Sequence, residues 1–306
     1  MLCLQHFLSF EHITKEQLQS IIEQAVEIKR NPQVYSKAAD NKGLLMLFQK
    51  SSTRTNLSFQ SGMNQLGGYV VPMDWNSSNF SISPIQYESR YVSRNSDIIM
   101  ARLKNHAALL ELARYATVPV INGCCDKYHP CQALADLMTI YEVAGTFSGV
   151  TLAYVGIHNN VANSLVEGCM LLGIKLLLVT PIINEPSWNQ LLMDNALQSG
   201  WVEQLDSLQD AAAQSQFVYT DTWIDMEFYQ EEFYQEEKRR RIKEMLPYQL
   251  NSSTLAGCTP YIMHDMPIHP GFEISEELVE SEHSVIYQQA ENRMHAQKAL
   301  LLHLLP

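Results

Sequence analysis

The amino-acid sequence predicts an α/β protein with two sub-domains, each built on a doubly wound parallel sheet. Short apolar runs, typical of buried strands, alternate along the chain with segments whose apolar residues recur every three or four positions, as in helices. Such alternation favours parallel sheets covered by helices. The alternation pauses near residues 145–149 and then starts again, which indicates two successive sub-domains.

The first run of elements ends near residue 145. A helix is predicted at 15–30, where Leu18, Ile21, Ile22, Ala25 and Ile28 have helical spacing. Strands are predicted at 43–49, 69–74, 96–103 and 118–123. Further helices are predicted at 55–67, closed by Gly67 and Gly68, at 106–116, and at 129–145, with Pro130 in the first turn, where proline is tolerated.

The second run repeats the pattern. Strands are predicted at 150–156, 175–181, 217–221 and 259–265, with a helix at 159–173 and a strongly amphipathic helix at 291–305. Between them FYQEE occurs twice in tandem, at 228–232 and 233–237, followed by KRRR. One interpretation is a solvated helix whose acidic and basic ends match the helix dipole. The other is a lid that touches a ligand.

Composition excludes several classes of function. The net charge of −12 and the pI near 5.3 argue against nucleic acid as a partner, so an anion site has to be a local basic pocket. No apolar run of 18 residues indicates a membrane span, and residues 1–17 lack the pattern of a signal peptide, so we expect a cytoplasmic protein. The six cysteines have no metal-binding or disulfide spacing and are expected to be free thiols, with Cys131 a small buried residue.

Small hydroxyl side chains surround one arginine directly after the strand at 43–49, in the sequence SSTRT at 51–55. Ligands of parallel α/β proteins bind at the carboxyl edge of the sheet, and the first turn of the next helix offers unpaired N–H groups. Hydroxyls and a guanidinium there suit a phosphate or an acyl phosphate. The alternative is an ordinary helix N-cap beside a surface arginine.

Two further strand ends favour the ligand site. Arg102 ends the strand at 96–103, and His129 and Gln132 begin the helix that follows the fourth strand. Because the carboxyl ends of parallel strands share one edge, we expect these side chains to converge with Arg54 and its hydroxyl neighbours.

Eight sequence blocks carry a resemblance to a known family. They are FQKSSTRTNLSF, IIMARL, HPCQALADLMTIYE, GIHNNVANSL, YTDTWIDM, EEKRRRIKEMLPYQLN, MHDMP and AENRMHAQKALL, in this order along nearly the whole chain. Together they resemble the aspartate/ornithine carbamoyltransferases, and the fifth and last blocks are most similar to the ornithine branch.

The resemblance implies a carbamoyl phosphate site in the first sub-domain. It assigns phosphate binding to Ser52, Thr53, Arg54 and Thr55. It assigns Arg102 to the phosphate and carbonyl oxygens, His129 and Gln132 to the carbamoyl group, and Arg293 to the completion of the pocket. The C-terminal helix is therefore expected to pack back on the first sub-domain, which gives a carbamoyl-phosphate domain of 1–145 plus 286–306 and an amine domain of 146–285.

The implied reaction is the attack of a neutral amine on the carbonyl carbon of carbamoyl phosphate. Donors such as His129, Arg102 and Thr55 would stabilise the oxyanion, and the arginines would stabilise the leaving phosphate. Positioning and electrostatics supply this chemistry without a metal, nucleotide cofactor or covalent intermediate.

The amine site is implied less completely. The family pattern assigns amine binding to Asn160, with Asn159 and Asn163 nearby, and to Asp221. The alternative role for these asparagines is helix capping. This sequence departs from the family in two segments. It reads Asp225-Met226-Glu227 where the ornithine enzymes have Ser-Met-Gly, and His264-Asp265-Met266-Pro267 where they have His-Cys-Leu-Pro. Asp225, Met226, Asp265 and Met266 are therefore predicted amine-binding residues, and Asp265 is a candidate general base beside Arg102, His129, Gln132 and Asp221.

The two extra carboxylates leave three readings open. They favour a more cationic acceptor than ornithine, such as a diamine, because a second carboxylate attracts cations and repels the α-carboxylate of an amino acid. Alternatively Asp225 and Asp265 are bystanders and ornithine is the acceptor. A third hypothesis is an inactive homologue that binds carbamoyl phosphate, against which the intact phosphate-site residues argue.

The family is built on trimers, so a homotrimer is implied. Family members lend a residue to the neighbouring active site from a loop that corresponds to 74–94. Here that loop matches weakly: Arg90 fits, and Ser77, Ser78 and Asn79 are candidates for the shared contact.

Overall fold

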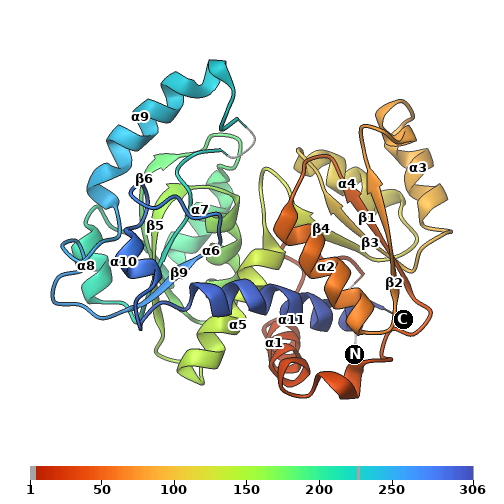
Figure 1. Ribbon diagram of the computed structural model, residues 1–306, viewed down its shortest axis with the longest axis horizontal. Helices are drawn as coiled ribbons and strands as arrows, with labels where there is room; N and C mark the ends of the chain where they lie inside the picture. Colours follow the sequence, from red (N-terminus) through yellow and green to blue (C-terminus); the bar gives the residue numbers. More distant parts are fainter. Residues whose placement is uncertain (1–4, 226–227, 306) are drawn as a thin grey trace. The chain divides into compact units, whose positions relative to one another are not determined.

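The computed structural model describes residues 5–225 and 228–305, and these form two compact units. Of the described residues, the first unit contains 5–138 and 291–305, and the second contains 139–225 and 228–290. Each unit is built on one sheet in which every pair of neighbouring strands is parallel. Figure 1 shows helices against both sheets, as the sequence predicts.

The first unit has a four-stranded sheet in the order β2-β1-β3-β4. Its strands are β1 (Gly43–Phe48), β2 (Tyr69–Asp74), β3 (Ile98–Arg102) and β4 (Val120–Cys124). Its helices are α1 (Lys15–Arg30), α2 (Thr53–Gln65), α3 (Ile85–Val92), α4 (His106–Tyr115), the first part of α5 (Pro130–Ala144) and most of α11 (Ile286–Leu304), with short 3-10 turns at Pro32–Tyr35 and Asn79–Ser81.

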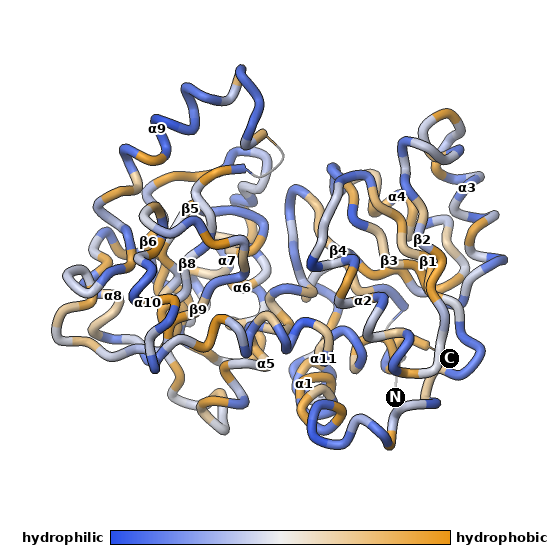
Figure 2. The backbone as a smooth tube through the Cα atoms, in the orientation of Figure 1, coloured by the Kyte–Doolittle hydropathy of each residue, from blue (hydrophilic) through white to orange (hydrophobic). Residues whose placement is uncertain are grey.

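Burial follows strand position in this sheet. The side chains of β1, β3 and β4 are almost all buried, and Figure 2 shows these strands as largely hydrophobic. The edge strand β2 is mostly exposed and contains Pro72, which an edge strand tolerates because its outer N–H groups need no strand partner. The core of the unit therefore lies around β1, β3 and β4.

The second unit has a five-stranded sheet in the order β7-β6-β5-β8-β9. Its strands are β5 (Thr151–His158), β6 (Lys175–Ile183), β7 (Val202–Gln204), β8 (Phe217–Thr220) and β9 (Tyr261–His264). Its helices are α6 (Asn160–Leu172), α7 (Gln190–Gln198), α8 (Leu208–Ala213), α9 (Gln235–Met245) and α10 (Glu276–Val279), with 3-10 turns at Glu232–Tyr234 and Leu246–Tyr248.

Both sheets are doubly wound, as predicted. In the first, the chain leaves β1 for β2 on one side and later returns to β3 on the other, so the order reverses between β1 and β3. In the second sheet the same reversal lies between β5 and β8. Such reversals are the points at which the connecting loops diverge and leave room for a ligand at the carboxyl edge.

The last helix packs on the first unit, but its predicted amphipathic character is wrong. Residues 295–301 are all buried, so two successive turns of α11 are covered on every side. Two polar side chains of α11 have partners in the neighbouring helices: Lys298 donates to Gln65 of α2 at 2.5 Å, and Lys29 of α1 donates to Asn292 at 2.7 Å. The side-chain amide of the buried Gln297 has no hydrogen-bond partner among the described residues. Hydrogen bonds to neighbouring helices, rather than exposure to solvent, thus satisfy Asn292 and Lys298 on the polar face that the sequence suggested.

Two other segments differ from the sequence-based prediction. The region 74–94, predicted as a loop, contains α3 and the turn Asn79–Ser81. The tandem FYQEE is not one solvated helix, because α9 begins only at Gln235 within the second copy, and Tyr234 and Arg241 are buried. Within the described residues no helix combines the length and the apolar character that a membrane span requires.

Candidate active site

The SSTRT turn lies at the carboxyl end of β1, where the chain enters α2. Ser52 is the N-cap of α2, and its hydroxyl accepts the backbone N–H of Thr55 at 3.2 Å. Thr53 and Arg54 occupy the first turn, which leaves helix N–H groups directed at the sheet edge. A pocket of about 520 Å³ opens beside the turn and is lined in part by Ser51, Ser52 and Thr53.

Arg102 lies at the point where the strand order of the first sheet reverses. It ends β3 and is the strand partner of Phe48, the last residue of β1. Its guanidinium donates to the hydroxyl of Thr55 at 3.5 Å, and its buried Nε has no hydrogen-bond partner among the described residues. The sequence-based expectation that the two strand ends converge is therefore met at this pair.

Arg293 joins the cluster from α11. One Nη donates to the Thr55 hydroxyl at 3.1 Å and the other to the side-chain oxygen of Gln132 at 2.6 Å. Arg293 is 4% exposed, and Gln132 and Thr55 are also buried. The amide of Gln132 donates in turn to the buried carboxylate of Asp136 at 2.8 Å, so one hydrogen-bonded chain orients Gln132 and Arg293.

His129 stands directly before α5 and is buried. Burial lowers the pKa of His129 well below 6.5, and the nearby charges of Arg293, Arg102, Lys50 and Arg54 lower it further. The imidazole is therefore neutral at physiological pH. Four cations around one neutral histidine create a strongly positive pocket in an otherwise acidic chain, which suits a compact anion.

The second unit places a polar pair at its own reversal point. The amide of Asn159, after β5, donates to the carboxylate of Asp221, after β8, at 2.6 Å. Asn159 also caps α6 through its side-chain oxygen, and Asp221, 3% exposed, accepts the backbone N–H of Thr222 at 2.6 Å. Asn160, the predicted amine ligand, is the partly exposed first residue of α6.

Asn163 has a structural environment. It is fully buried, its amide donates to the backbone oxygen of Ser187 at 2.7 Å, and its oxygen lies 2.9 Å from the Nε2 of His158. Of the three asparagines in this segment, Asn159 is therefore the helix cap and Asn163 fixes the loop that contains Ser187.

The segment after β9 is held by His264. Its Nδ1 accepts the backbone N–H of Met266 at 2.8 Å, and its Nε2 lies 3.2 Å from the carboxylate of Glu273. Met266 has a left-handed backbone with φ of 62°, and its bond to Pro267 is cis. The hydrogen bond between Met266 and His264 spans Asp265, whose side chain is 11% exposed, and so holds its backbone in place.

Asp225 is not an isolated carboxylate, contrary to the charge argument made from the sequence. Its Oδ2 forms an ion pair with Arg241 of α9 at 3.2 Å and accepts the hydroxyl of Tyr234 at 3.0 Å. Met226, the other residue predicted in this loop, lies outside the described residues.

Sequence reasoning missed three residues that organise the site: Asp136, Asn159 in its contact with Asp221, and Arg241. Asp136 had a signal, because it stands four positions after Gln132 and so faces the same side of a helix. The other two contacts join residues 62 and 16 positions apart in separate elements, which no local pattern reveals.

Cys131 agrees with its predicted character. It is fully buried, and burial raises the pKa of its thiol to about 12, which makes it a poor nucleophile. Among the described residues, no group of three His, Cys, Asp or Glu side chains is arranged to hold a metal ion.

Comparisons with known proteins agree with this geometry. Residues 5–142 match the carbamoyl-P binding domain of aspartate/ornithine carbamoyltransferase, and residues 148–304 match the Asp/Orn binding domain. The chain is 38% identical to an ornithine carbamoyltransferase of Archaeoglobus fulgidus, with 99% of this chain and 98% of that protein covered.

Solved structures give the same relationship. The ornithine carbamoyltransferase of Pyrococcus furiosus superposes with a TM-score of 0.90 at 36% identity, covering 99% of this chain and 98% of that one. The enzyme of Thermus thermophilus superposes with a TM-score of 0.87 at 32% identity, covering 99% of each chain. With both domains matched and nearly every residue covered, the chain belongs to the aspartate/ornithine carbamoyltransferase family.

Proposed function

We propose that this protein is an ornithine carbamoyltransferase, which transfers the carbamoyl group of carbamoyl phosphate to the side-chain amine of L-ornithine and releases citrulline and phosphate. The observation that carries the proposal is the hydrogen-bonded cluster of Thr55, Arg102, Gln132 and Arg293 beside a neutral His129. Relatives that are 36–38% identical over nearly the whole chain have the name of this activity.

The first unit would bind carbamoyl phosphate. The α2 N-terminus, with Ser52, Thr53, Arg54 and Thr55, would hold the phosphate, because its N–H groups and dipole favour an anion. Arg102 and Arg293 already donate to one hydroxyl, that of Thr55, which brings two guanidinium groups to the same point. His129 and Gln132 would hold the carbamoyl group. The predicted domain boundaries, 1–145 plus 286–306 and 146–285, remain part of this proposal.

The reaction requires a neutral amine to attack the carbonyl carbon. A C–N bond forms, negative charge moves to the carbonyl oxygen, the C–O bond to phosphate breaks, and the amine loses a proton. A neutral imidazole at His129 can donate one hydrogen bond to that oxygen, and Arg102 can donate another, which are the donors an oxyanion site needs. The arginines stabilise the phosphate as its charge grows.

The amine would bind in the second unit. Asp221, oriented by Asn159, would meet the ammonium group of ornithine, and Asn160 would contact its amino-acid end. Met266 would line the pocket. Asp265 stands on a fixed backbone beside the imidazole of His264, 3.5 Å away, and remains the candidate to accept the proton of the amine.

The ion pair of Asp225 favours ornithine over a diamine. The diamine hypothesis depends on two uncompensated carboxylates in the amine pocket, and Arg241 compensates one of them at 3.2 Å. One remaining extra carboxylate, Asp265, gives less reason to exclude the α-carboxylate of an amino acid. Ornithine is therefore the acceptor that the described charges fit best.

The proposal includes a homotrimer in the cytoplasm. Support for self-association comes from the first unit, where Val71, Ile82, Tyr87 and Tyr91 expose 39%, 84%, 57% and 65% of their surface along β2 and the segment up to α3. Exposed apolar side chains beside an unpaired sheet edge are typical of an interface. We propose a second and third copy of this chain as the occupants, and residues 77–79 as the source of the shared contact.

The test is an assay with carbamoyl phosphate and ornithine, lysine and putrescine as acceptors, following both phosphate and the ureido product. We expect turnover of ornithine above the other amines. Arg54→Ala should lower kcat/KM for carbamoyl phosphate by about 10²-fold or more, because a charge-assisted phosphate contact is lost. Arg30→Ala, an equivalent change on the exposed end of α1, should leave it unchanged.

Two outcomes would contradict the proposal. Exclusive turnover of putrescine would assign the acceptor to the diamine class. Binding of carbamoyl phosphate without turnover of any amine would favour the inactive homologue.

A further inference from the structure

Asp225 lies on the loop that follows β8, four positions after Asp221. Two groups reach its carboxylate: Nη1 of Arg241 at 3.2 Å and the hydroxyl of Tyr234 at 3.0 Å. Burial, and then the charge of Asp225, raise the pKa of Tyr234 to about 12, so its hydroxyl stays protonated and donates. The loop thus has a carboxylate, but a guanidinium balances its charge.

Arg241 is held in place from several sides. Its side chain is only 9% exposed, Nη1 donates to the backbone oxygen of Trp223 at 3.4 Å, and Nε donates to Glu237 at 2.8 Å. Its guanidinium also lies 5.7 Å from the ring centre of Tyr234. A guanidinium with this many fixed contacts has little freedom to leave Asp225 for solvent.

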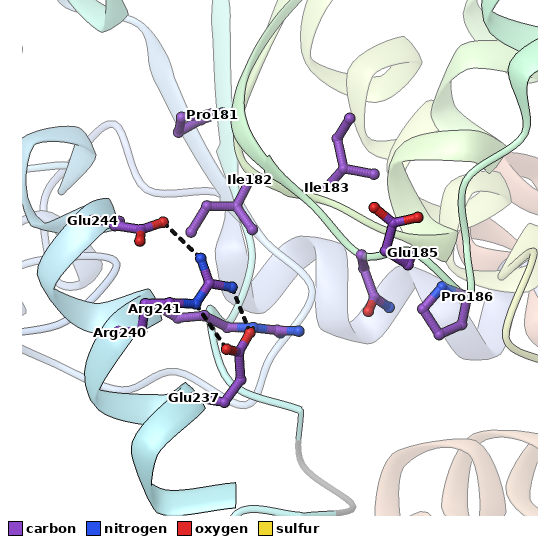
Figure 3. Close-up of a pocket in the computed structure, with 10 residues that line it drawn as sticks. Pro181, Ile182, Ile183, Glu185, Pro186, Glu237, Arg240, Arg241 and Glu244 are labelled. Atoms are coloured by element: carbon purple, nitrogen blue, oxygen red, sulfur yellow. Dashed lines mark hydrogen bonds and ion pairs between the residues drawn. The ribbon is translucent and has the colours of Figure 1, made fainter.

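Other charged residues of α9 also form ion pairs. Arg240 pairs with Glu237 at 2.7 Å and with Glu244 at 2.9 Å. The hydrogen bonds that Glu237 accepts from Arg240 and from Arg241 lower its pKa to about 2. Figure 3 shows these pairs, with Pro181 and Ile182 of β6 opposite them across a pocket of about 460 Å³. Arg240 thus has the same charge and helix as Arg241 and shares its partner Glu237, but no described contact joins Arg240 to Asp225.

From this arrangement we infer that Arg241 is a specificity-determining residue that acts through Asp225. By pairing with Asp225, it prevents a second carboxylate from competing with Asp221 for the cation of the acceptor and from repelling the α-carboxylate of an amino acid. The inference rests on the proposed function and deepens it. The presence of Asp225 alone predicts a preference for diamines, and the ion pair cancels that preference.

The test compares kcat/KM for ornithine and for putrescine in Arg241→Met, which keeps much of the side-chain volume and removes the charge. The uncompensated Asp225 should change the ratio in favour of putrescine by about tenfold or more, the effect of about 1.4 kcal/mol. The double variant Arg241→Met/Asp225→Asn should return the ratio toward that of the original chain. Arg240→Met is the matched control and should leave the ratio unchanged.

The ratio of the two kcat/KM values distinguishes a role of Arg241 in specificity from a role in stability. A merely structural Arg241 would lower both values of kcat/KM together, and such a uniform loss would overturn the inference. An equal change of the ratio in Arg240→Met would also overturn it, because the effect would then belong to the charge of α9 as a whole.

Failure of the proposed function can be distinguished from failure of this inference. If the original chain turns over no amine, the proposed activity fails, and calorimetric titration of ornithine and putrescine in the presence of inorganic phosphate still measures the ratio of affinities. A ratio that moves toward putrescine in Arg241→Met, and returns in the double variant, supports the inference in that case as well.

Discussion

At the scale of the residue, the pKa of His129 shows the electrostatics of the proposed phosphate pocket. Its pKa lies well below 6.5 because it is buried and faces Arg293, Arg102, Lys50 and Arg54. A protonated imidazole there would add a fifth positive charge, whereas a neutral one leaves a donor for the carbonyl oxygen without attracting a counter-ion. The four cations would therefore have two effects: they would attract the anion of the proposed function, and they keep the imidazole neutral.

This environment predicts how stability depends on pH. Below pH 6.5 the unfolded chain protonates His129 and the folded chain does not, so this residue lowers the free energy of unfolding as the pH falls. The variant His129→Gln should lose less stability than the original chain between about pH 7.5 and about pH 5.5, measured by urea denaturation.

Other histidines with lowered pKa values contribute to both proteins equally, so the difference between the two isolates His129. The exposed His12 gives the control: His12→Gln should follow the pH dependence of the original chain. If His129→Gln and the original chain lose equal stability, His129 is not held neutral.

At the scale of the element, the two copies of the tandem repeat each contribute a tyrosine with a different contact. Tyr234, from the second copy, donates to Asp225. Tyr229, from the first copy, stacks on His269 with ring centres 5.3 Å apart and planes at 12°, and the ammonium of Lys238 lies 3.5 Å from its ring centre. The repeat thus fastens the start of α9 both to the loop after β8 and to the loop after β9.

The contacts of Tyr229 predict a local loss of order. Tyr229→Leu should lower the free energy of unfolding by about 1 to 2 kcal/mol, because a stacking contact and a cation–π contact are lost together. Hydrogen exchange should rise in residues 228–242. Phe233→Leu changes an exposed aromatic of the same repeat, at 72% exposure, and should remain within about 0.5 kcal/mol of the original chain. Equal effects of the two substitutions would contradict the anchoring role.

The limits of sequence-based prediction also appear at this scale. Strands β1, β3 and β5 and the residues at their ends were predictable, because buried apolar runs are local signals and parallel strands must share one edge. Helix α3 and the partners of Asp225 were not. Helix α3 has only 8 residues, too few to give a clear helical pattern. The pairing of Asp225 with Arg241 depends on where α9 lies in the tertiary structure.

The amphipathic character predicted for α11 failed for a related reason. Its polar residues Arg293, Gln297 and Lys298 suggest a solvent-exposed face, but all three are buried. Arg293 and Lys298 donate hydrogen bonds to residues of other helices. A sequence pattern gives polarity and not the location of partners, so buried polar helices are misread as exposed ones.

At the scale of the whole molecule, the exposed apolar side chains of the first unit predict self-association. Sedimentation should give about 105 kDa, three times the 34.9 kDa of one chain. Ile82→Glu, which places a charge on a side chain 84% exposed, should shift the population toward smaller species. Val34→Glu, a similar change at 77% exposure in the turn Pro32–Tyr35, should leave the mass unchanged. A monomer in the original chain would contradict the proposed trimer.

The bonds of Arg293 have a consequence for the way the protein is made. Its partners Gln132 and Thr55 precede it by 161 and 238 positions, and the whole second unit lies between them. A ribosome makes the partners first and the arginine only after that unit has emerged. A nascent first domain therefore lacks Arg293 beside Thr55 and Gln132 until α11 has been made. Under the proposed function, its carbamoyl phosphate site would be incomplete until then. Premature termination within the second unit would yield a chain that the substrate cannot stabilise in this way.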